Sequence, residues 1–299
     1  MTGNALRLHA RHRTEITYAG GVRESVNEAR MLPVDGPRTR VEEMRLDVMP
    51  DAVVHTHTDV YGNLVGWFQV PGTHRRLVVE SIGIVNSCAP PPLEESLASP
   101  AQWNLLGDPV FADINAEWLG RTRHAAWGPR VADLARSLQL TADRRGRGVR
   151  AFADDLAAAI HATVAYVPGA TLVDTPVEVV ASDRRGVCQD LAHLMIALCR
   201  RDGIPARYVS GWLHDPARGA PGESHAWVEV LVPGAGWYEV DPTHPEPITG
   251  RWVRVATGRD YADVTPLRGT YQGAPTEKMT VTVETEEAPA VTEAPERIR

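Results

Sequence analysis

The chain has 299 residues, and its 31 basic side chains against 38 acidic ones give a net charge of −7. This length fits one large domain or two smaller ones, and 43% hydrophobic with 23% charged residues is ordinary for a soluble globular protein. The acidic balance argues against the basic face that nucleic-acid binding needs. We expect neither a membrane helix nor a signal peptide, because no run of about 18 apolar residues occurs and the arginine-bearing start has no apolar core.

The first part of the chain is predicted to form β-strands, because Val, Ile, Leu, Thr and Tyr alternate partially with polar residues. The predicted strands cover residues 14–17, 41–49, 51–61, 64–70 and 76–86. Tyr61-Gly62-Asn63 has the composition of a hairpin turn. Prolines at positions 90–92 then favour a stiff linker. We therefore expect a small antiparallel β domain over residues 1–92.

The middle of the chain, about residues 95–200, is predicted to be helical. Apolar residues recur there at helical spacing. The predicted helices cover residues 131–140, 149–164 and 186–201. The last of them is apolar on nearly every side, which indicates a buried central helix, and the glycine and proline at positions 203 and 205 end it.

Strands return in the last part of the chain. The predicted strands cover residues 206–212, 226–231, 236–240, 252–256 and 279–285. From Ala288 onward, the composition is typical of a flexible tail. Helices followed by a run of strands indicate an α+β fold. We expect a catalytic core over residues 93–273, and a final strand with an acidic tail over residues 274–299.

Three cysteines, Cys88, Cys188 and Cys199, are too few for a disulfide framework, and their odd number leaves at least one thiol unpaired. We therefore expect a reducing, cytoplasmic setting. Cys188 begins the buried helix, where the helix dipole and unpaired N–H groups favour a thiolate. Cys88 and Cys199 are interpreted as packing residues. By position alone, Cys188 is either a third packing residue or a nucleophile.

A histidine and an aspartate favour the nucleophile. His225 opens a predicted strand, and Asp241 ends the next one, directly before a proline. Adjacent antiparallel strands can align such a pair. The carboxylate then accepts a hydrogen bond from one imidazole nitrogen, and the other nitrogen faces the thiol of Cys188.

These residues lie in three segments, GVCQDLAHLMIALCRRDGIPARYVSGWL, SHAWVEV and GWYEVDPT. Together they resemble the bacterial transglutaminase-like family of papain-like cysteine enzymes, and the resemblance extends over about residues 12–285. It implies an α+β fold in which a central buried helix packs on an antiparallel sheet, preceded by a small antiparallel β domain. It also implies that Cys188 is the nucleophile, His225 the general base and acid, and Asp241 the orienting carboxylate, without a cofactor.

The resemblance leaves several nearby positions open. The oxyanion hole would use the backbone N–H of Cys188 and a second donor, for which Tyr166 is a candidate; a packed core tyrosine is the alternative. Trp212 and Trp227 either line the substrate cleft or fill the core. His244 stands where asparagine is common in relatives, and it belongs either to the rim of the site or to the surface.

The remaining polar candidates are interpreted as structural. Gln189 and Asp190, in the first turn of the helix, are expected to brace its start. His55 and His57 share one strand face, but no third metal ligand accompanies them. His193 lies inside the buried helix and is interpreted as a satisfied core histidine. We therefore expect no metal site, and a zinc hydrolase is the least favoured hypothesis.

The expected chemistry is acyl transfer from an amide or ester through a thioester on Cys188. With water as acceptor, the protein is a peptidase or amidase; with an amine, it is a transglutaminase-type amide synthase. Hydrolysis is slightly favoured, because water is always available. We expect a peptide, protein or small amide as substrate. A binding or scaffold module that keeps the fold without the chemistry is the alternative from another class.

Overall fold

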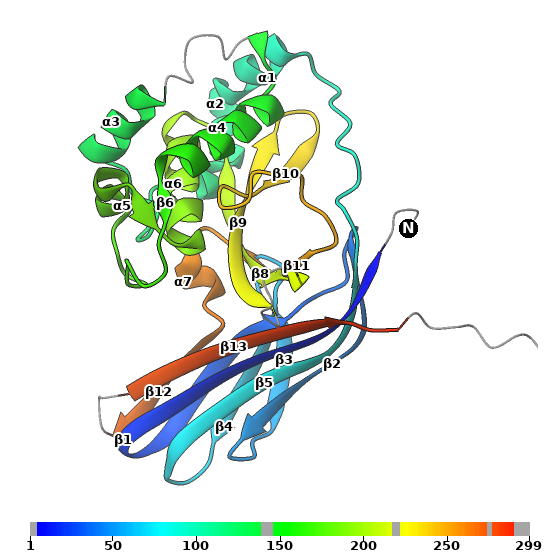
Figure 1. Ribbon diagram of the computed structural model, residues 1–299, viewed down its shortest axis with the longest axis vertical. Helices are drawn as coiled ribbons and strands as arrows, with labels where there is room; N and C mark the ends of the chain where they lie inside the picture. The colour runs from blue at the N-terminus through cyan, green and yellow to red at the C-terminus, as the bar shows by residue number, and fades with distance from the viewer. Residues whose placement is uncertain (1–4, 139–145, 217–221, 274–276, 290–299) are drawn as a thin grey trace, which may run out of the picture.

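The structure is a computed structural model that describes residues 5–138, 146–216, 222–273 and 277–289. Figure 1 shows helices gathered around one sheet and a long second sheet beside them, so the α+β class is confirmed. Residues 139–140 of the predicted helix over 131–140, and residues 290–299 of the predicted tail, lie outside the described residues.

The long sheet is antiparallel, and in the described residues it has seven strands with β1 at its centre. They are β1 (Leu6–Leu32), β2 (Thr39–Met49), β3 (Val54–Thr58), β4 (Leu64–Val70), β5 (His74–Ser87), β12 (Leu267–Gly273) and β13 (Glu277–Glu287). β5 and β13 flank the first half of β1, and β4 and β12 flank its second half. The two ends of the described chain therefore meet in one sheet, as the blue and red strands of Figure 1 show.

The length of β1 was not predicted, since the sequence indicates only residues 14–17. Alternate residues of β1 are buried, but His12 and Thr14 occupy two of the buried positions. Polar residues at core positions weaken the alternation of hydrophobicity on which strand prediction depends. The boundary expected at residue 273 also falls between β12 and β13, which both pair with β1.

The predicted hairpin turn joins β3 to β4 and is confirmed. Gly62 has a positive φ of 84°, and its N–H donates to the carbonyl of Asp59 at 3.0 Å. The Asn63 side chain accepts from the N–H of Thr257 and donates to its carbonyl, both at 2.8 Å. Because Thr257 belongs to the second sheet, this turn fastens the two sheets together.

The second sheet has the strand order β10-β9-β8-β11 and carries the helices. Its strands are β8 (Ala206–Leu213), β9 (Glu223–Val232), β10 (Gly236–Val240) and β11 (Trp252–Gly258). The helices are α1 (Ser99–Leu106), α2 (Pro109–Ile114), η1 (Ala116–Trp118), α3 (Pro129–Ser137), α4 (Val149–Thr163), α5 (Val177–Asp183), α6 (Cys188–Arg201) and α7 (Tyr261–Val264). Two short strands, β6 (Ala165–Tyr166) and β7 (Arg185–Gly186), pair in parallel just before α6.

Helix α6 is the predicted central helix, and every residue from Asp190 to Arg200 is buried. Its apolar side chains share one core with Ala226 and Val228 of β9. Each fully buried Leu or Ile in such a core contributes roughly 1.5–3 kcal/mol. Because strand residues alternate between faces, Trp227 points to the side of the sheet away from α6, where it joins a separate apolar cluster. The packing holds the start of α6 at a fixed place against β9.

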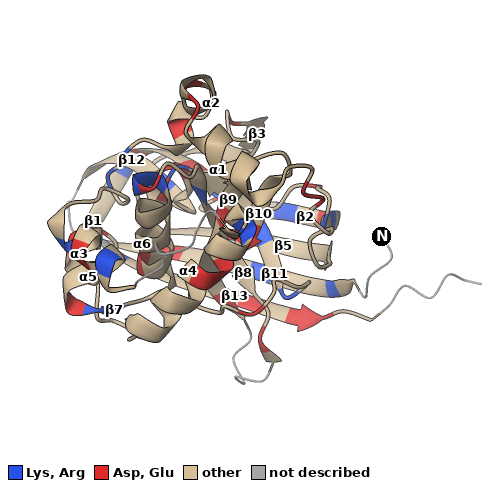
Figure 2. Cartoon of the chain, turned by 90° about the horizontal axis from the view of Figure 1, so that it is seen from above, with Lys and Arg blue, Asp and Glu red and all other residues tan. Residues whose placement is uncertain are grey.

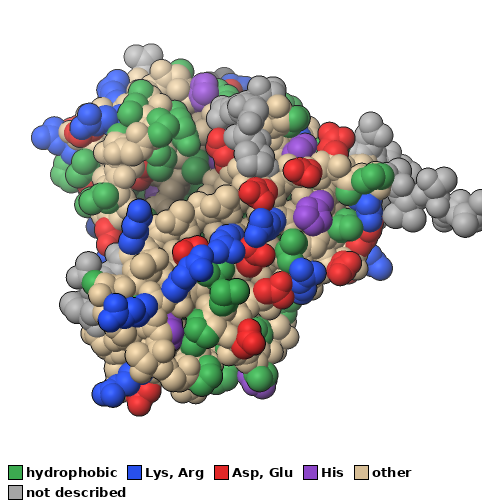
Figure 3. Space-filling model, turned by 60° about the horizontal axis from the view of Figure 1, so that its bottom comes forward, with side chains coloured by type: hydrophobic (Ala, Val, Ile, Leu, Met, Phe, Trp, Pro, Cys, Tyr) green, Lys and Arg blue, Asp and Glu red, His purple; other side chains and the backbone are tan. Residues whose placement is uncertain are grey.

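The surface carries mixed charges. Figure 2 shows basic and acidic residues interspersed along the chain, and Figure 3 shows their side chains mixed on the face that it presents. On the long sheet, Arg76 and Arg13 both pair with Glu15, and Arg11 pairs with Glu80. In the described part of the chain, no helix has both the length and the apolar character needed to traverse a bilayer.

Candidate active site

Cys188 is the first residue of α6, and the turn before it is held from several sides. The Asp190 carboxylate accepts a hydrogen bond from the N–H of Val187 at 2.8 Å and another from the hydroxyl of Thr171 at 2.6 Å. Gly186 leaves room for this carboxylate, since a Cβ there would lie 2.7 Å from the Cβ of Asp190. Asp190 thus braces the helix start, as the sequence predicts.

His225 of β9 and Asp241, directly after β10, form a buried pair. The Nε2 atom of His225 lies 2.6 Å from Oδ2 of Asp241. The same carboxylate accepts from the indole N–H of Trp252 at 2.9 Å and from the N–H of Thr243 at 2.8 Å. Asp241 is only 1% exposed, and its contacts fix its orientation. A carboxylate with several donors is stabilised in its charged form.

The electrostatics of this pair favour an imidazolium beside a carboxylate. Burial lowers the pKa of His225, but Asp241 and Cys188 raise it by more, so that the pKa rises to about 10. Burial raises the pKa of Asp241, but His225, Trp252 and Thr243 outweigh this effect and leave the pKa below its ordinary value. Both groups are therefore charged at neutral pH.

The thiol of Cys188 completes the arrangement, since it lies close enough to His225 to raise the pKa of the imidazole. Asp241 occupies the Nε2 side of the ring, which leaves the Nδ1 side for the sulfur. Trp227 stacks on the imidazole with an interplanar angle of 22° and a centroid distance of 6.1 Å. The structure thus brings together the three residues that the sequence singled out, from the start of α6, the start of β9 and the end of β10.

The other two thiols lie in packing positions. Cys199 is completely buried within α6, and burial raises the pKa of its thiol. Cys88 is half-buried at the end of β5, and its Sγ donates to the carbonyl of Arg38 at 3.5 Å. Both placements agree with the interpretation from the sequence.

Hydrogen-bond donors for an oxyanion lie beside the thiol. The N–H groups of Cys188 and Gln189 occupy the first positions of α6, where a helix supplies no acceptor. The Gln189 side chain donates to the carbonyl of Val173 at 3.1 Å, so it ties a neighbouring loop to the helix start. Tyr166 pairs with Gly186 across β6 and β7 and is 42% exposed, which excludes the alternative of a packed core tyrosine. Its part in an oxyanion hole stays a prediction.

The expectation that Trp212 lines the substrate cleft needs correction. Trp212 is 1% exposed and packs with Leu8 and Val253 between the two sheets. Its indole N–H donates to Nδ1 of His12 at 3.2 Å. Its strand turns this side chain towards β1, so it fills the core between the sheets. Trp227 is also fully buried, although its ring touches His225.

His244 lies at the rim of the site and not on the open surface. Its ring centroid is 5.4 Å from that of His225 and 6.4 Å from that of Trp252. Trp252, which holds the Asp241 carboxylate, is the site residue that sequence reasoning missed. Its only signal was an aromatic residue at the start of a predicted strand, and nothing local connects that position to Asp241.

The histidines considered as metal ligands have other surroundings. His193 is stacked between His124 and Tyr208, and its Nε2 accepts from the N–H of Tyr261 at 3.2 Å. Burial lowers the pKa of His193 to about 3, so the ring is neutral, as expected for a satisfied core histidine. His55 and His57 are exposed on β3. Within the described ranges, no three His, Cys, Asp or Glu side chains converge as a metal-ligand set.

Comparisons with known proteins match both halves of this architecture. Residues 133–242 match the transglutaminase-like superfamily, and residues 8–86 match the bacterial transglutaminase-like N-terminal region. An uncharacterised protein of Mycobacterium leprae is 34% identical over 284 residues, which cover 93% of this chain and 98% of that one. A protein-glutamine gamma-glutamyltransferase of Pseudomonas aeruginosa is 35% identical over 131 residues, covering 38% of this chain and 19% of that one.

A solved structure supports the fold over nearly the whole chain. A candidate cysteine protease from Cytophaga hutchinsonii superimposes with a TM-score of 0.73 at 20% identity, covering 96% of this chain and 92% of that one. With the thiol, imidazole and carboxylate in place, the fold defines a thiol enzyme. The chain belongs to the transglutaminase-like superfamily, and its N-terminal sheet includes the bacterial N-terminal region.

Proposed function

We propose that this protein transfers acyl groups from peptide-like amides through a thioester on Cys188, with water as the usual acceptor. The observation that carries the proposal is the hydrogen bond between His225 and Asp241, with the Cys188 thiol next to the same imidazole. An imidazolium next to a cysteine in general favours the thiolate, which is the reactive form of a cysteine nucleophile.

In the first half-reaction, the Cys188 sulfur attacks the amide carbonyl carbon and a C–S bond forms. The negative charge that develops on the carbonyl oxygen faces the N–H groups at the start of α6. Collapse of this adduct breaks the C–N bond, and the His225 imidazolium gives its proton to the departing amine. Asp241 keeps the ring oriented and stabilises its charged form throughout.

In the second half-reaction, His225 takes a proton from the acceptor, and the acceptor oxygen or nitrogen attacks the thioester. The C–S bond breaks and the thiolate is restored. Water as acceptor yields a carboxylic acid, and the sum is amide hydrolysis. An amine as acceptor yields a new amide, which is the activity that the name of the Pseudomonas aeruginosa relative describes for that protein.

An apolar ledge beside the thiol favours acyl donors with an apolar side chain. The ledge consists of four apolar side chains that are all at least 39% exposed, namely Tyr166, Val167, Leu172 and Val173. Exposed apolar side chains that gather in this way usually mark an interaction site. The loop that holds them is tied to the start of α6 by the contacts of Thr171 with Asp190 and of Gln189 with Val173. A substrate carbonyl at Cys188 would therefore place its neighbouring side chain near this ledge.

The test follows the release of p-nitroaniline from N-acetyl-leucine p-nitroanilide, with and without hydroxylamine as a competing acceptor. We expect release by the wild type, loss of release in Cys188→Ala, and no effect of the matched variant Cys88→Ser. The ratio of acid to hydroxamate measures how the thioester divides between water and an amine. Release that survives in Cys188→Ala would rule out the proposed nucleophile. If even the wild type released no p-nitroaniline, a binding module would be favoured.

We also place this activity in the cytoplasm, because a thiolate nucleophile must be kept reduced. Cell fractionation with an antibody against the protein tests this. Recovery in the cytoplasmic fraction is the expected result, and recovery outside the inner membrane would overturn the proposal.

A further inference from the structure

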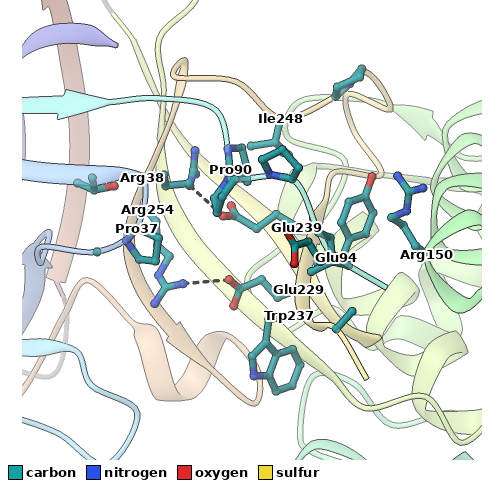
Figure 4. Close-up of a pocket in the computed structure, with 18 of the residues that line it drawn as sticks. Pro37, Arg38, Pro90, Glu94, Arg150, Glu229, Trp237, Glu239, Ile248 and Arg254 are labelled. Atoms are coloured by element: carbon teal, nitrogen blue, oxygen red, sulfur yellow. Dashed lines mark hydrogen bonds and ion pairs between the residues drawn. The ribbon is translucent and has the colours of Figure 1, made fainter. Parts of the chain in front are cut away.

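A cavity of about 720 Å³ lies behind the candidate active site, on the face of the second sheet that is turned away from α6. Figure 4 shows its lining, which comes from the loop before β2, the proline-rich linker, all four strands of the sheet and the loop after β10. Neither Cys188, His225 nor Asp241 lines it. The cavity is therefore separate from the candidate active site.

Two buried glutamates form the floor, and all their carboxylate oxygens are already engaged. Glu229 receives Arg207 Nε on Oε2 and Arg254 Nη1 on Oε1, the latter at 2.9 Å. Glu239 faces Arg38 Nε through Oε1 and accepts from the indole of Trp227 through Oε2, both at 2.8 Å. Figure 4 shows both carboxylates at the cavity wall, Glu239 beside Arg38 and Glu229 beside Arg254.

Arg38, in contrast, has an N–H donor for which the described part of the chain provides no acceptor. Each guanidinium carries five N–H donors. Arg38 uses Nη1 on the carbonyls of Thr249 and Cys88, at 3.2 and 3.4 Å, and its Nε lies 2.8 Å from Oε1 of Glu239 as an ion pair without hydrogen-bond geometry. Its Nη2 has no hydrogen-bond acceptor among the described residues, although the side chain is only 6% exposed. A buried donor without an acceptor is costly, so this nitrogen points to an acceptor from outside the chain.

The floor of the cavity also carries more positive than negative charge. Arg38, Arg207 and Arg254 face only Glu229 and Glu239, so one positive charge is uncompensated. The remaining charged lining residues lie exposed at the rim, where solvent screens them. They are Asp35, Glu94 and Arg150. The floor of the cavity, with Arg254 at its partly exposed edge, is thus complementary to a single negative charge.

The walls above the floor are largely apolar. They include Pro37, Pro91, Pro247 and Ile248, together with the ring of Trp237. The guanidinium of Arg207 lies 4.1 Å from the centroid of that ring, which holds the indole in place. Apolar walls around a few polar groups are typical of pockets for small organic ligands, which often lie between domains.

We propose that this cavity is a second binding site, which takes an organic carboxylate with an apolar body. The carboxylate lies against the guanidinium groups of Arg38 and Arg254, and the apolar body lies against the proline walls and Trp237. A free carboxylic acid and the C-terminus of a peptide both carry this chemistry. Hydrogen bonds between a guanidinium and a carboxylate are charge-assisted and stronger than neutral ones.

The experiment is calorimetric titration of the full chain with matched probes. Phenylacetate and 2-phenylethanol differ in the carboxylate, and N-acetyl-alanyl-phenylalanine carries the same group on a peptide. Phenyl phosphate tests a different anion. We expect phenylacetate to bind at least about tenfold more tightly than 2-phenylethanol, which is the gain typical of one charge-assisted hydrogen bond. If the dipeptide binds more tightly than phenylacetate, the natural carboxylate is a peptide C-terminus. If it binds more weakly, the natural ligand is a free acid.

Two variants and one control locate the site. Arg38→Gln and Arg254→Gln should each weaken phenylacetate binding about tenfold, and Arg254 is the most exposed of the three arginines of the floor. Arg45→Gln, which removes an exposed arginine of β2 outside the cavity, should change nothing. Equal binding of phenylacetate and 2-phenylethanol, tighter binding of phenyl phosphate, wild-type affinity in both variants, or no binding by either acid overturns the proposal. The titrations are made on the full chain carrying Cys188→Ala, so no probe is turned over and these outcomes are independent of the activity of Cys188.

Discussion

Replacement of Asp241 by asparagine tests how the buried carboxylate controls the chemistry of Cys188. The substitution keeps the size of the side chain but removes the charge that raises the pKa of His225 to about 10. Burial then remains as a force that lowers this pKa, so we expect it to fall to about 6.5 or below, the ordinary value for histidine. At pH 8, the charged fraction of His225 falls from about 99% to about 3%, which is roughly a 30-fold loss.

The assay is the rate at which iodoacetamide alkylates each cysteine, measured by mass spectrometry between pH 6 and 10. If the reactive species is the thiolate next to the imidazolium, alkylation of Cys188 at pH 8 slows at least about 30-fold in Asp241→Asn. Amide hydrolysis should fall further, by up to about 10⁴-fold, because the ring also loses its orientation. Cys88 and Cys199 serve as internal controls within each sample.

The matched control is Asp47→Asn, which removes an exposed aspartate of β2. It should leave the alkylation of Cys188 unchanged. The reasoning is refuted if Asp241→Asn stays folded and its Cys188 reacts within about threefold of the wild-type rate at pH 8. The charge of Asp241 would then not control the reactivity of the Cys188 thiol.

The remaining predictions concern stability and metals. Gly186→Ala places a Cβ against Asp190 and should destabilise the fold by about 1–3 kcal/mol in urea melts while slowing Cys188 alkylation; an unchanged midpoint contradicts this. Burial lowers the pKa of His12 to about 4, below its unfolded value of about 6.5, so the unfolded chain binds an extra proton as the pH falls through that window and stability declines. His12→Phe removes this group, so the slope of the unfolding free energy against pH should fall by the equivalent of up to about one bound proton. An unchanged slope would speak against this prediction. EDTA should leave hydrolysis unchanged, whereas its loss would revive the zinc-hydrolase hypothesis.

Much of the candidate site was predictable because its residues mark the ends of elements. Cys188 follows a glycine turn at the start of an apolar helix, and Asp241 precedes a proline that ends a strand. These are local signals, and they survive in the structure as the start of α6 and the end of β10. The contact of His225 with Asp241 follows because β9 and β10 pair in antiparallel register.

What could not be predicted depends on contacts between distant segments. β1 buries His12 and Thr14, so its hydrophobic alternation is hidden even though its backbone is paired on both sides. The sequence could not decide whether Trp212 lines the cleft or fills the core, because the answer depends on the face that its strand turns towards β1. The second cavity is assembled from segments that share no sequence motif, so only the folded chain reveals it.

The central claim is that Cys188 carries the acyl group during turnover. Its most direct test is mass spectrometry of the protein quenched with acid while it cleaves N-acetyl-leucine p-nitroanilide. The account predicts an N-acetyl-leucyl adduct on the peptide that contains Cys188, and its disappearance in Cys188→Ala. Continued cleavage without this adduct, or an adduct on Cys88 instead, would contradict it.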